Sequence, residues 1–346
     1  MPECFLHRNL GVIHSIRSRF NKGIKALNFI KKMNQFPLIS ILINNYNYAR
    51  FLYESIDSAL GQTYPHVEVI VVDDGSTDTS REIICEYGDT IVPVFKENGG
   101  QASAFNAGFK KSQGDIIVFL DSDDYFAKNK IESILDIFLR YEDIGWLFHP
   151  LQEVDVNREK LFTPSDKNES KSFFIDFRGN IIKGDMPTFL LPATTGLCFR
   201  RNLLESFFPV PSNLKISTDN FLRIASVYLT PGYILNEKLA VHRIHGNNAF
   251  ERRQDTEIVR SKTNIRTAFY IRKKFPETKK FADRLCAHSA GKLFATTGEY
   301  EFLDLPELAD YLEHFRKPFL DLKSIMRIFF NYCRVKFSGK RSTVNY

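Results

Sequence analysis

Short apolar runs alternate with stretches of helical periodicity in the part of the chain that begins at about residue 37. The runs are rich in β-branched and aromatic residues and occupy 38–43, 67–72, 90–95, 115–120 and 145–149. Between them, apolar residues recur every three or four positions over 48–61, 79–88, 101–112 and 128–141. Alternation of strand-like and helical segments is typical of βαβ units. The pattern therefore predicts an α/β fold with a mostly parallel central sheet flanked by helices.

Helical patterns return in the second part of the chain, at 199–208, 217–228, 257–274 and 318–337, and the segment 233–241 is strand-like. Residues 151–190 are mixed in polarity, which favours surface loops. These shifts divide the chain into four parts. We expect a helical extension over 1–36, two halves of one α/β domain over 37–150 and 151–250, and a helical C-terminal region over 251–346.

The N-terminal extension is strongly basic. The chain carries a net charge of +6, and no acidic residue occurs between Glu3 and Glu54. Apolar residues recur at helical spacing among the basic ones, both here and over 318–337. These segments predict basic amphipathic helices that can lie on anionic lipid, and packing against the main domain is the alternative. One hypothesis is therefore that the terminal helices bind the surface of a membrane.

The cysteines carry information about the compartment. All five are widely scattered, and none forms a C-x-x-C pair, so neither a zinc site nor a disulfide framework is predicted. The chain lacks a run of about 18 apolar residues and the pattern of a cleaved signal peptide. We therefore expect a cytoplasmic protein that does not span a membrane, with any membrane contact at its inner face.

Polar residues follow the predicted strands, where ligands bind in parallel sheets. The first run ends in Asn44-Asn45-Tyr46-Asn47 and has no G-x-G-x-x-G, which disfavours a dinucleotide site. The second run ends in Asp73 and Asp74, where a carboxylate can bind a base or a ribose hydroxyl. Alternatively, these acids form the turn and cap the next helix.

The fourth run delivers Asp121, Asp123 and Asp124 directly after a buried strand. Three carboxylates so close repel each other unless a cation neutralises them, and Mg²⁺ or Mn²⁺ takes one or two carboxylates together with substrate phosphates. An EF-hand is excluded because Tyr125 and Phe126 stand where it needs an oxygen ligand and a glycine. We expect these exposed acids and Asp74 to face one crevice that binds a metal and a diphosphate.

Four segments together carry a resemblance to a known family. They are Ser40 to Asn47, Gln62-Thr63-Tyr64, Val72 to Asp78 and Phe119 to Asp124. In order and spacing they resemble the family 2 glycosyltransferases. The resemblance implies a GT-A fold and an inverting reaction. The implied donor is a nucleotide-sugar, commonly a UDP-sugar, and the implied acceptor is a hydroxyl of a glycan or a lipid-linked molecule.

The resemblance also assigns roles to individual positions. Donor contacts fall on Asn44, Tyr46, Asp73, Asp74, Gly100, Gln101, Asp121, Ser122 and Arg243. The metal falls on Asp121 and Asp123, with His245 as a further ligand or a phosphate contact. Gln101 stands where many relatives carry an arginine. Two alternatives stay open, because Gly100 can simply begin a helix after a turn and His245 can belong to the solvated surface.

The catalytic base implied by the resemblance is Asp219, at the start of the helical stretch 217–228. The acid that usually precedes it is replaced by Thr218. A carboxylate there can take the proton of the acceptor hydroxyl, and capping of the helix by Ser217 or Asp219 is the alternative.

Two other functional classes compete with an enzyme. One is an inactive relative that keeps the nucleotide-sugar pocket and binds a membrane or a protein partner. The other is nucleic-acid binding, which the acidic strand ends disfavour because they repel phosphate backbones.

Overall fold

The computed structural model describes residues 36–155, 157, 159–161, 171–189, 191–246, 248, 254–297 and 306–314. The predicted amphipathic helix of 318–337 and all but the last residue of the 1–36 extension lie outside these residues. Within the described part, no helix combines the length and the apolar character needed to cross a bilayer.

An eight-stranded sheet forms the centre of the molecule. Its strands in spatial order are β3 (Val92–Phe95), β2 (Val67–Asp73), β1 (Ile39–Asn45), β4 (Ile116–Asp121), β9 (Leu197–Arg200), β6 (Trp146–Phe148), β10 (Gly232–Ile234) and β8 (Phe173–Ile175). The first four are parallel, whereas β9 runs antiparallel to β4 and β6. Strand β10 is parallel to β6, and β8 is antiparallel to β10. The predicted mostly parallel sheet is confirmed.

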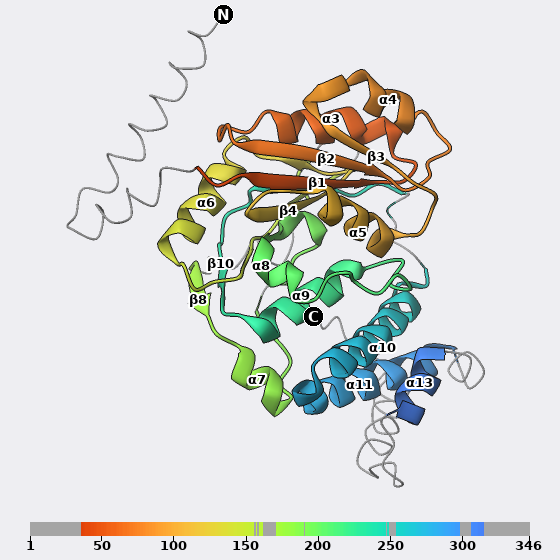
Figure 1. Cartoon of the computed structure of the whole chain (residues 1–346). Coiled ribbons are helices and arrows are strands. Elements are labelled where there is room, and N and C mark those ends of the chain that lie inside the picture. Colours follow the sequence, from red (N-terminus) through yellow and green to blue (C-terminus); the bar gives the residue numbers. More distant parts are fainter. Residues whose placement is uncertain are drawn as a thin grey trace, which may run out of the picture.

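Helices cover both faces of this sheet (Figure 1). The helices with described bounds are α3 (Ala49–Leu60), α4 (Ser80–Glu86), α5 (Gln101–Lys111), α6 (Lys130–Arg140), α7 (Arg178–Lys183), α8 (Arg201–Glu205), α9 (Thr218–Leu229), α10 (Thr256–Lys274), α11 (Lys279–Thr297) and α13 (Pro306–His314). Helices α3 and α4 lie on one face and α5, α8 and α9 on the other, with the α10–α11 pair beyond α9. The arrangement is the α/β architecture that the alternating pattern predicted.

Successive residues of the inner strands feed two separate cores. On β1, Ile41 and Ile43 pack with Leu52 of α3 on one face, whereas Leu42 packs with Phe105 of α5 on the other. All five are buried. Because side chains alternate across a strand, a strand that is apolar at every position must be covered on both sides. This burial fixes the register that aligns the strand ends.

Two predicted elements were wrong in detail. The predicted helix of 199–208 is strand β9 up to Arg200 and becomes helical only from Arg201. Strand β9 lies between β4 and β6, so Cys198 and Phe199 are buried on opposite faces and show no alternation of polarity. The loop-like segment 151–190 contains two short strands and helix α7 as well as loops.

The predicted strand 233–241 is two strands in different sheets. Strand β10 joins the main sheet, whereas β11 (Ala240–Arg243) lies between β5 (Tyr125–Phe126) and β7 (Gln152–Val154) in a three-stranded sheet. Strand β5 directly follows the acidic cluster at the end of β4. This small sheet therefore brings the segment after β11 against those acids.

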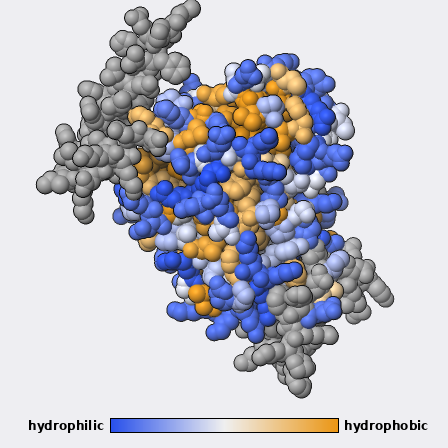
Figure 2. Space-filling view, in the orientation of Figure 1, coloured by the Kyte–Doolittle hydropathy of each residue, from blue (hydrophilic) through white to orange (hydrophobic). Residues whose placement is uncertain are grey.

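The surface differs between the two ends of the molecule (Figure 2). Apolar side chains gather over the end that carries β2, β3, α3 and α4, and Val92 and Phe95 of the edge strand β3 are among the exposed apolar residues. The end formed by α10 and α11 is mostly hydrophilic in the same view. This hydrophilic end consists of α10 and α11, which also line part of a central cavity.

One contact in the sheet can be tested by a pair of matched substitutions. A Cβ at Gly232 would lie 2.0 Å from two ring atoms of Trp146, whereas a Cβ at Gly179 on helix α7 would meet nothing within 4 Å. Gly232→Ala should therefore lower the free energy of unfolding by about 1–3 kcal/mol. Gly179→Ala should leave it equal or raise it by up to about 1 kcal/mol. Urea unfolding of both variants measures the difference, and equal midpoints would contradict the packing of β10 on β6.

Candidate active site

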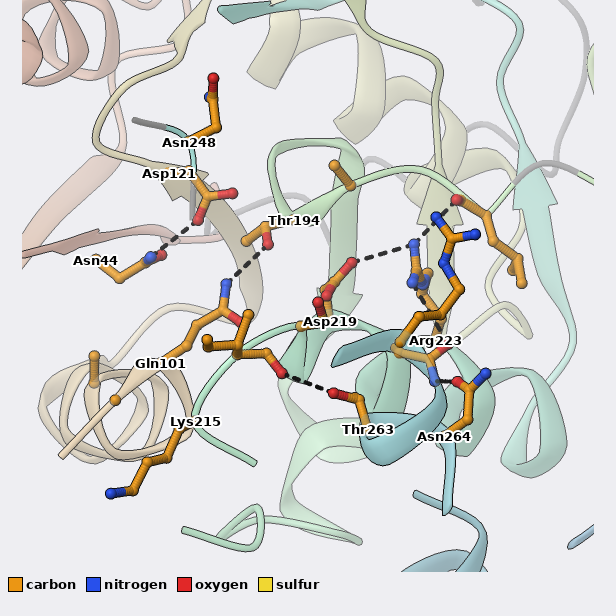
Figure 3. A pocket seen from close by; sticks show the side chains of 18 of the residues that line it. Asn44, Gln101, Asp121, Thr194, Lys215, Asp219, Arg223, Asn248, Thr263 and Asn264 are labelled. Carbon is orange, nitrogen blue, oxygen red and sulfur yellow. Dashed lines mark hydrogen bonds and ion pairs between the residues drawn. The ribbon is translucent and has the colours of Figure 1, made fainter. Parts of the chain in front are cut away.

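A cavity of about 850 Å³ opens at the carboxyl ends of the parallel strands. Four carboxylates line it: Asp74 after β2, Asp121 and Asp123 at and after the end of β4, and Asp219 on α9. The two acidic strand ends thus face one crevice, as the sequence predicted. Figure 3 shows Asn44 and Asp121 on one wall and Asp219 with Arg223 on another, with Gln101 and Thr194 between them.

Asp121 is placed by the pairing of two strands. It lies directly opposite Asn44 in the parallel pairing of β1 with β4, and Asn44 Nδ2 donates a 2.9 Å hydrogen bond to Asp121 Oδ1. Burial, together with the charges of Asp123 and Asp124, raises the pKa of Asp121 to about 8. The carboxylate therefore sits where negative charge is poorly stabilised by the protein alone.

Asp123 is buried rather than exposed, which corrects the expectation from sequence. His245 Nε2 lies 3.0 Å from Asp123 Oδ2, and Asn248 Nδ2 lies 3.3 Å from the same oxygen. Burial raises the pKa of Asp123, and the hydrogen bond with His245 opposes that shift. The ring of His245 packs against Phe51, with centroids 4.6 Å apart, and His245 is itself buried. The alternative that His245 belongs to the solvated surface is therefore wrong.

Asp124 links the acidic cluster to two other segments of the chain. Its carboxylate accepts hydrogen bonds from Thr195 Oγ1 at 2.5 Å and from the Arg243 amide at 3.0 Å, and it lies 3.1 Å from His242 Nδ1. Thr195 Oγ1 in turn accepts the amide of Asp121 at 3.2 Å. Strand β11 and the turn before β9 are thereby fixed to the end of β4.

Lys130 supplies a buried cation behind the cluster, a role that the sequence analysis missed. Its ammonium donates to the Thr195 carbonyl at 2.6 Å and lies 3.6 Å from the centroid of the Phe126 ring. Burial lowers its pKa to about 8. One sequence signal was present: Lys130 shares the apolar face of α6 with Ile134 and Ile137, an unusual place for a lysine.

The two acids at the end of β2, Asp73 and Asp74, have different surroundings. Asp74 lines the cavity and accepts the amide of Gly99 at 3.1 Å and that of Gly100 at 2.7 Å. Gly100 has φ +83°, so a glycine suits this turn at the start of α5. Asp73 is fully buried and accepts hydrogen bonds from Asn45 Nδ2 and the Ser76 amide. It forms the turn and does not line the cavity.

Gln101 connects the loop between β3 and α5 to the start of α9. Its Nε2 donates to Thr194 Oγ1 at 3.3 Å (Figure 3). Its Oε1 accepts the amide of Thr218 at 2.8 Å. The Gln101 amide also donates to the Lys215 carbonyl at 3.0 Å. The residue that replaces the family's usual arginine is therefore a bridge between two walls of the cavity.

Asp219 lies in the first turn of α9 with its carboxylate 3.2 Å from Arg223 Nη1. Neither Ser217 nor Asp219 makes the predicted side-chain cap, since no side-chain cap bond is present at the N-terminus of α9. Arg223 Nη1 also donates to the carbonyls of Leu191 and Pro192. The carboxylate is thereby held by an arginine that is itself anchored to the backbone.

Arg243 does not reach the cavity. Its Nη2 donates to Glu54 at 2.7 Å, and its guanidinium lies 4.6 Å from the Phe51 ring centroid and 5.3 Å from that of Tyr125. The predicted donor contact is replaced by a buried structural contact. Tyr46 and Ser122, which the resemblance also assigned to the donor, do line the cavity.

The acidic cluster can supply a divalent metal with one or two protein ligands, but not with a complete set. Among the described residues, no group of three His, Cys, Asp or Glu side chains is placed to hold an ion. Mg²⁺ and Mn²⁺ accept one or two carboxylates and complete their shell with water and substrate phosphates. The oxygens of Asp121 and Asp123 provide such a set. Burial raises the pKa of each carboxyl, so a cation beside them would stabilise their charged forms.

Comparison with known proteins places the chain in a family. Residues 40–205 match the family model described as glycosyl transferase family 2. A relative from Rickettsia typhi, named only as an uncharacterized glycosyltransferase, is 34% identical over 227 residues, which cover 62% of this chain and 67% of the relative. The chain belongs to glycosyl transferase family 2. A similarly named relative from Nostoc sp. is 37% identical over 215 residues. The matched region covers 61% of this chain and 66% of the length of that relative.

Solved structures share the fold of this family 2 chain. S. aureus TarS in complex with UDP-GlcNAc has a TM-score of 0.62 and 19% identity, covering 87% of this chain and 91% of TarS. A mannosyltransferase from Pyrobaculum calidifontis in complex with GDP-Man and Mn²⁺ has a TM-score of 0.51 and 16% identity, covering 91% and 94%. At these identities the similarity concerns the fold alone, and it agrees with the mostly parallel sheet and flanking helices.

The link between Thr195 and the acidic cluster predicts a loss of stability on removal of one hydroxyl. Thr195→Val keeps the shape of the side chain but leaves the Asp121 amide and one Asp124 oxygen without the partner described above. The free energy of unfolding should fall by about 1–3 kcal/mol. Thr296→Val, at an exposed position of α11, is the control and should change it by less than about 0.5 kcal/mol. Equal urea midpoints for the two variants would contradict the proposed support of β4.

Proposed function

We propose that this family 2 chain is an inverting glycosyltransferase that moves a sugar from a nucleotide-sugar to a hydroxyl of a glycan or lipid-linked acceptor. The proposed donor is a UDP-sugar. One observation carries the proposal: Asp74, Asp121, Asp123 and Asp219 line the same cavity at the strand ends. The first three suit a donor and its metal, and the fourth stands across the cavity on α9 where an acceptor can be activated.

The nucleotide is proposed to lie over the ends of β1 and β2. Asn44, Tyr46 and Asp74 line that part of the cavity, and the loop at Gly100 is held there by Asp74. A carboxylate and amide side chains at strand ends suit the hydrogen-bonding groups of a base and a ribose. The choice of uridine is supported by TarS, which has the same fold and was solved with UDP-GlcNAc.

The donor diphosphate is proposed to bind at Asp121 and Asp123 together with Mg²⁺ or Mn²⁺. The metal, when bound, supplies positive charge that stabilises the departing diphosphate. The mannosyltransferase that shares the fold was solved with Mn²⁺ and GDP-Man, which supports a metal of this kind. His245 and Asn248 hold the Asp123 carboxylate in position, so their proposed role is to orient this ligand. His245 would instead be a direct ligand if the metal took the place of its hydrogen bond with Asp123.

Asp219 is proposed to act as the general base. Its carboxylate would take the proton of the acceptor hydroxyl while the oxygen attacks the anomeric carbon and the diphosphate leaves from the opposite face. This displacement inverts the configuration of that carbon. Arg223, anchored to two backbone carbonyls, fixes the direction of the carboxylate. Residues 37–150 would thus bind the donor and 151–250 the acceptor, with Gln101 joining the halves.

The proposed donor and metal can be tested by ligand-induced stabilisation. UDP-, GDP- and dTDP-sugars are added to the whole protein with Mn²⁺ or with a chelator, and thermal unfolding is followed. A ligand at a hundred times its Kd stabilises the folded state by about 2.7 kcal/mol. UDP-sugars should raise the unfolding temperature most, and only with Mn²⁺. The absence of stabilisation by any nucleotide-sugar would overturn the proposed function, whereas metal-independent stabilisation would overturn only the metal site.

The proposed base predicts a selective loss of turnover. Asp219→Asn keeps the size of the side chain but removes the group that accepts the proton. Release of UDP from the donor that stabilises the protein should slow on the order of 10²–10⁴-fold. The donor-induced rise in unfolding temperature should persist.

Asp89→Asn is the matched control for this test, since Asp89 is an exposed acid on the short helix η1 (Gly88–Thr90), outside the cavity. It should leave UDP release unchanged. Equal rates for Asp219→Asn and Asp89→Asn would exclude Asp219 as the base.

A further inference from the structure

Helices α10 and α11 form a wall of the cavity that lies beyond the family-matched residues 40–205. From α11, the cavity is lined by Phe281, Leu285, His288 and Lys292. The last three follow Phe281 by four, seven and eleven positions, so all four lie on one face of the helix. This face lines the cavity along much of the length of α11. The proposed function assigns no ligand to this part of the cavity.

The charges on this wall differ from those on the strand ends. Arg260 of α10 and Lys292 of α11 line the cavity, and within the fully described helices α10 and α11 no acidic residue does. Glu257 lies outside the lining and is shared by both cations, 2.8 Å from Arg260 Nη1 and 3.3 Å from Lys292 Nζ. Both cations thus contact the same carboxylate at the edge of the cavity. The Lys292 side chain is only 15% exposed, so its charge is weakly screened by solvent.

The two cations lie toward the end of α9 that carries Asp219. Asn220 Nδ2 donates to Asn264 at 2.7 Å near the start of α9, and Tyr228 at its far end contacts Glu277 beyond the end of α10. The two helices therefore run side by side in the same direction. Arg260 is one turn before Asn264, about 6 Å toward the N-terminal end where the base lies.

We propose that Arg260 and Lys292 form a subsite for an anionic group of the acceptor, a phosphate or a carboxylate carried near the hydroxyl that receives the sugar. This rests on the proposed function of the cavity as a glycosyl-transfer site. The donor diphosphate belongs to Asp121 and Asp123 on the sheet side, and these helices stand on another wall. A neutral acceptor would gain nothing from a pair of partly desolvated cations, whereas an anionic one gains charge-assisted hydrogen bonds there.

The subsite is tested with three sugars that differ only in charge. Glucose 6-phosphate, glucuronate and glucose are titrated calorimetrically into the whole protein, with UDP and Mn²⁺ at saturation and again without them. Both anionic sugars, or one of them, should bind about tenfold more tightly than glucose. The stronger of the two identifies the class of anion. Binding of glucose as tight as that of both anions, or no binding of any sugar, overturns the proposal.

Three variants separate a binding role from a structural one. Lys292→Gln should weaken binding of the anionic sugar about tenfold and weaken UDP far less. Glu257→Gln removes the neutralising carboxylate and should strengthen anion binding, which a merely structural role would not do. Lys274→Gln, at an exposed position of α10 outside the cavity, is the control and should change nothing.

An equal loss of UDP and sugar affinity in Lys292→Gln would assign the cations to the donor and overturn the proposal. Failure of UDP to bind the wild-type protein would count against the proposed function instead. The titrations without UDP test the anion subsite in either case.

Discussion

Repulsion among three closely spaced carboxylates, two of them buried and Asp121 half-buried, is the constraint around which the site is arranged. Asp121, Asp123 and Asp124 follow one another at the end of a strand that is covered on both faces. Each is restrained by a different part of the chain: Asn44 from β1, His245 from beyond β11, and Thr195 from before β9. These contacts hold the acids in place, while burial raises the pKa of Asp121 and of Asp123, so their negative charge is poorly stabilised there.

The small three-stranded sheet also helps to hold these acids in place. Strand β11 delivers the Arg243 amide and the His242 ring to Asp124, and the turn after it delivers His245 and Asn248 to Asp123. A segment more than a hundred residues away in sequence thereby becomes part of the site. Arg243 itself points away, into a stack with Phe51 and Tyr125 that anchors the strand.

Sequence periodicity predicted the parallel half of the sheet well, because β1, β2 and β4 are mostly apolar and are separated by clear helical stretches. It failed at β9, where burial on both faces makes a short apolar strand indistinguishable from a buried helix. The carboxylates at strand ends were predictable because topology alone places them at one edge. The contributions of Lys130 and Thr195 were not, since they meet across 65 residues of sequence through tertiary packing. Likewise, nothing in the sequence separated Asp74, which faces the cavity, from Asp73, which supports the turn.

The bridge made by Gln101 has an evolutionary consequence. Its side chain donates through one atom and accepts through another, and the acceptor oxygen satisfies the Thr218 amide at the entry to α9. An arginine has five donors and no acceptor, so it cannot serve that amide. A chain with arginine here must begin α9 differently, because the left-handed bend at Ser217 would no longer be linked to this loop. Positions 101 and 217–219 should therefore covary among relatives, as one inherited unit rather than as independent sites.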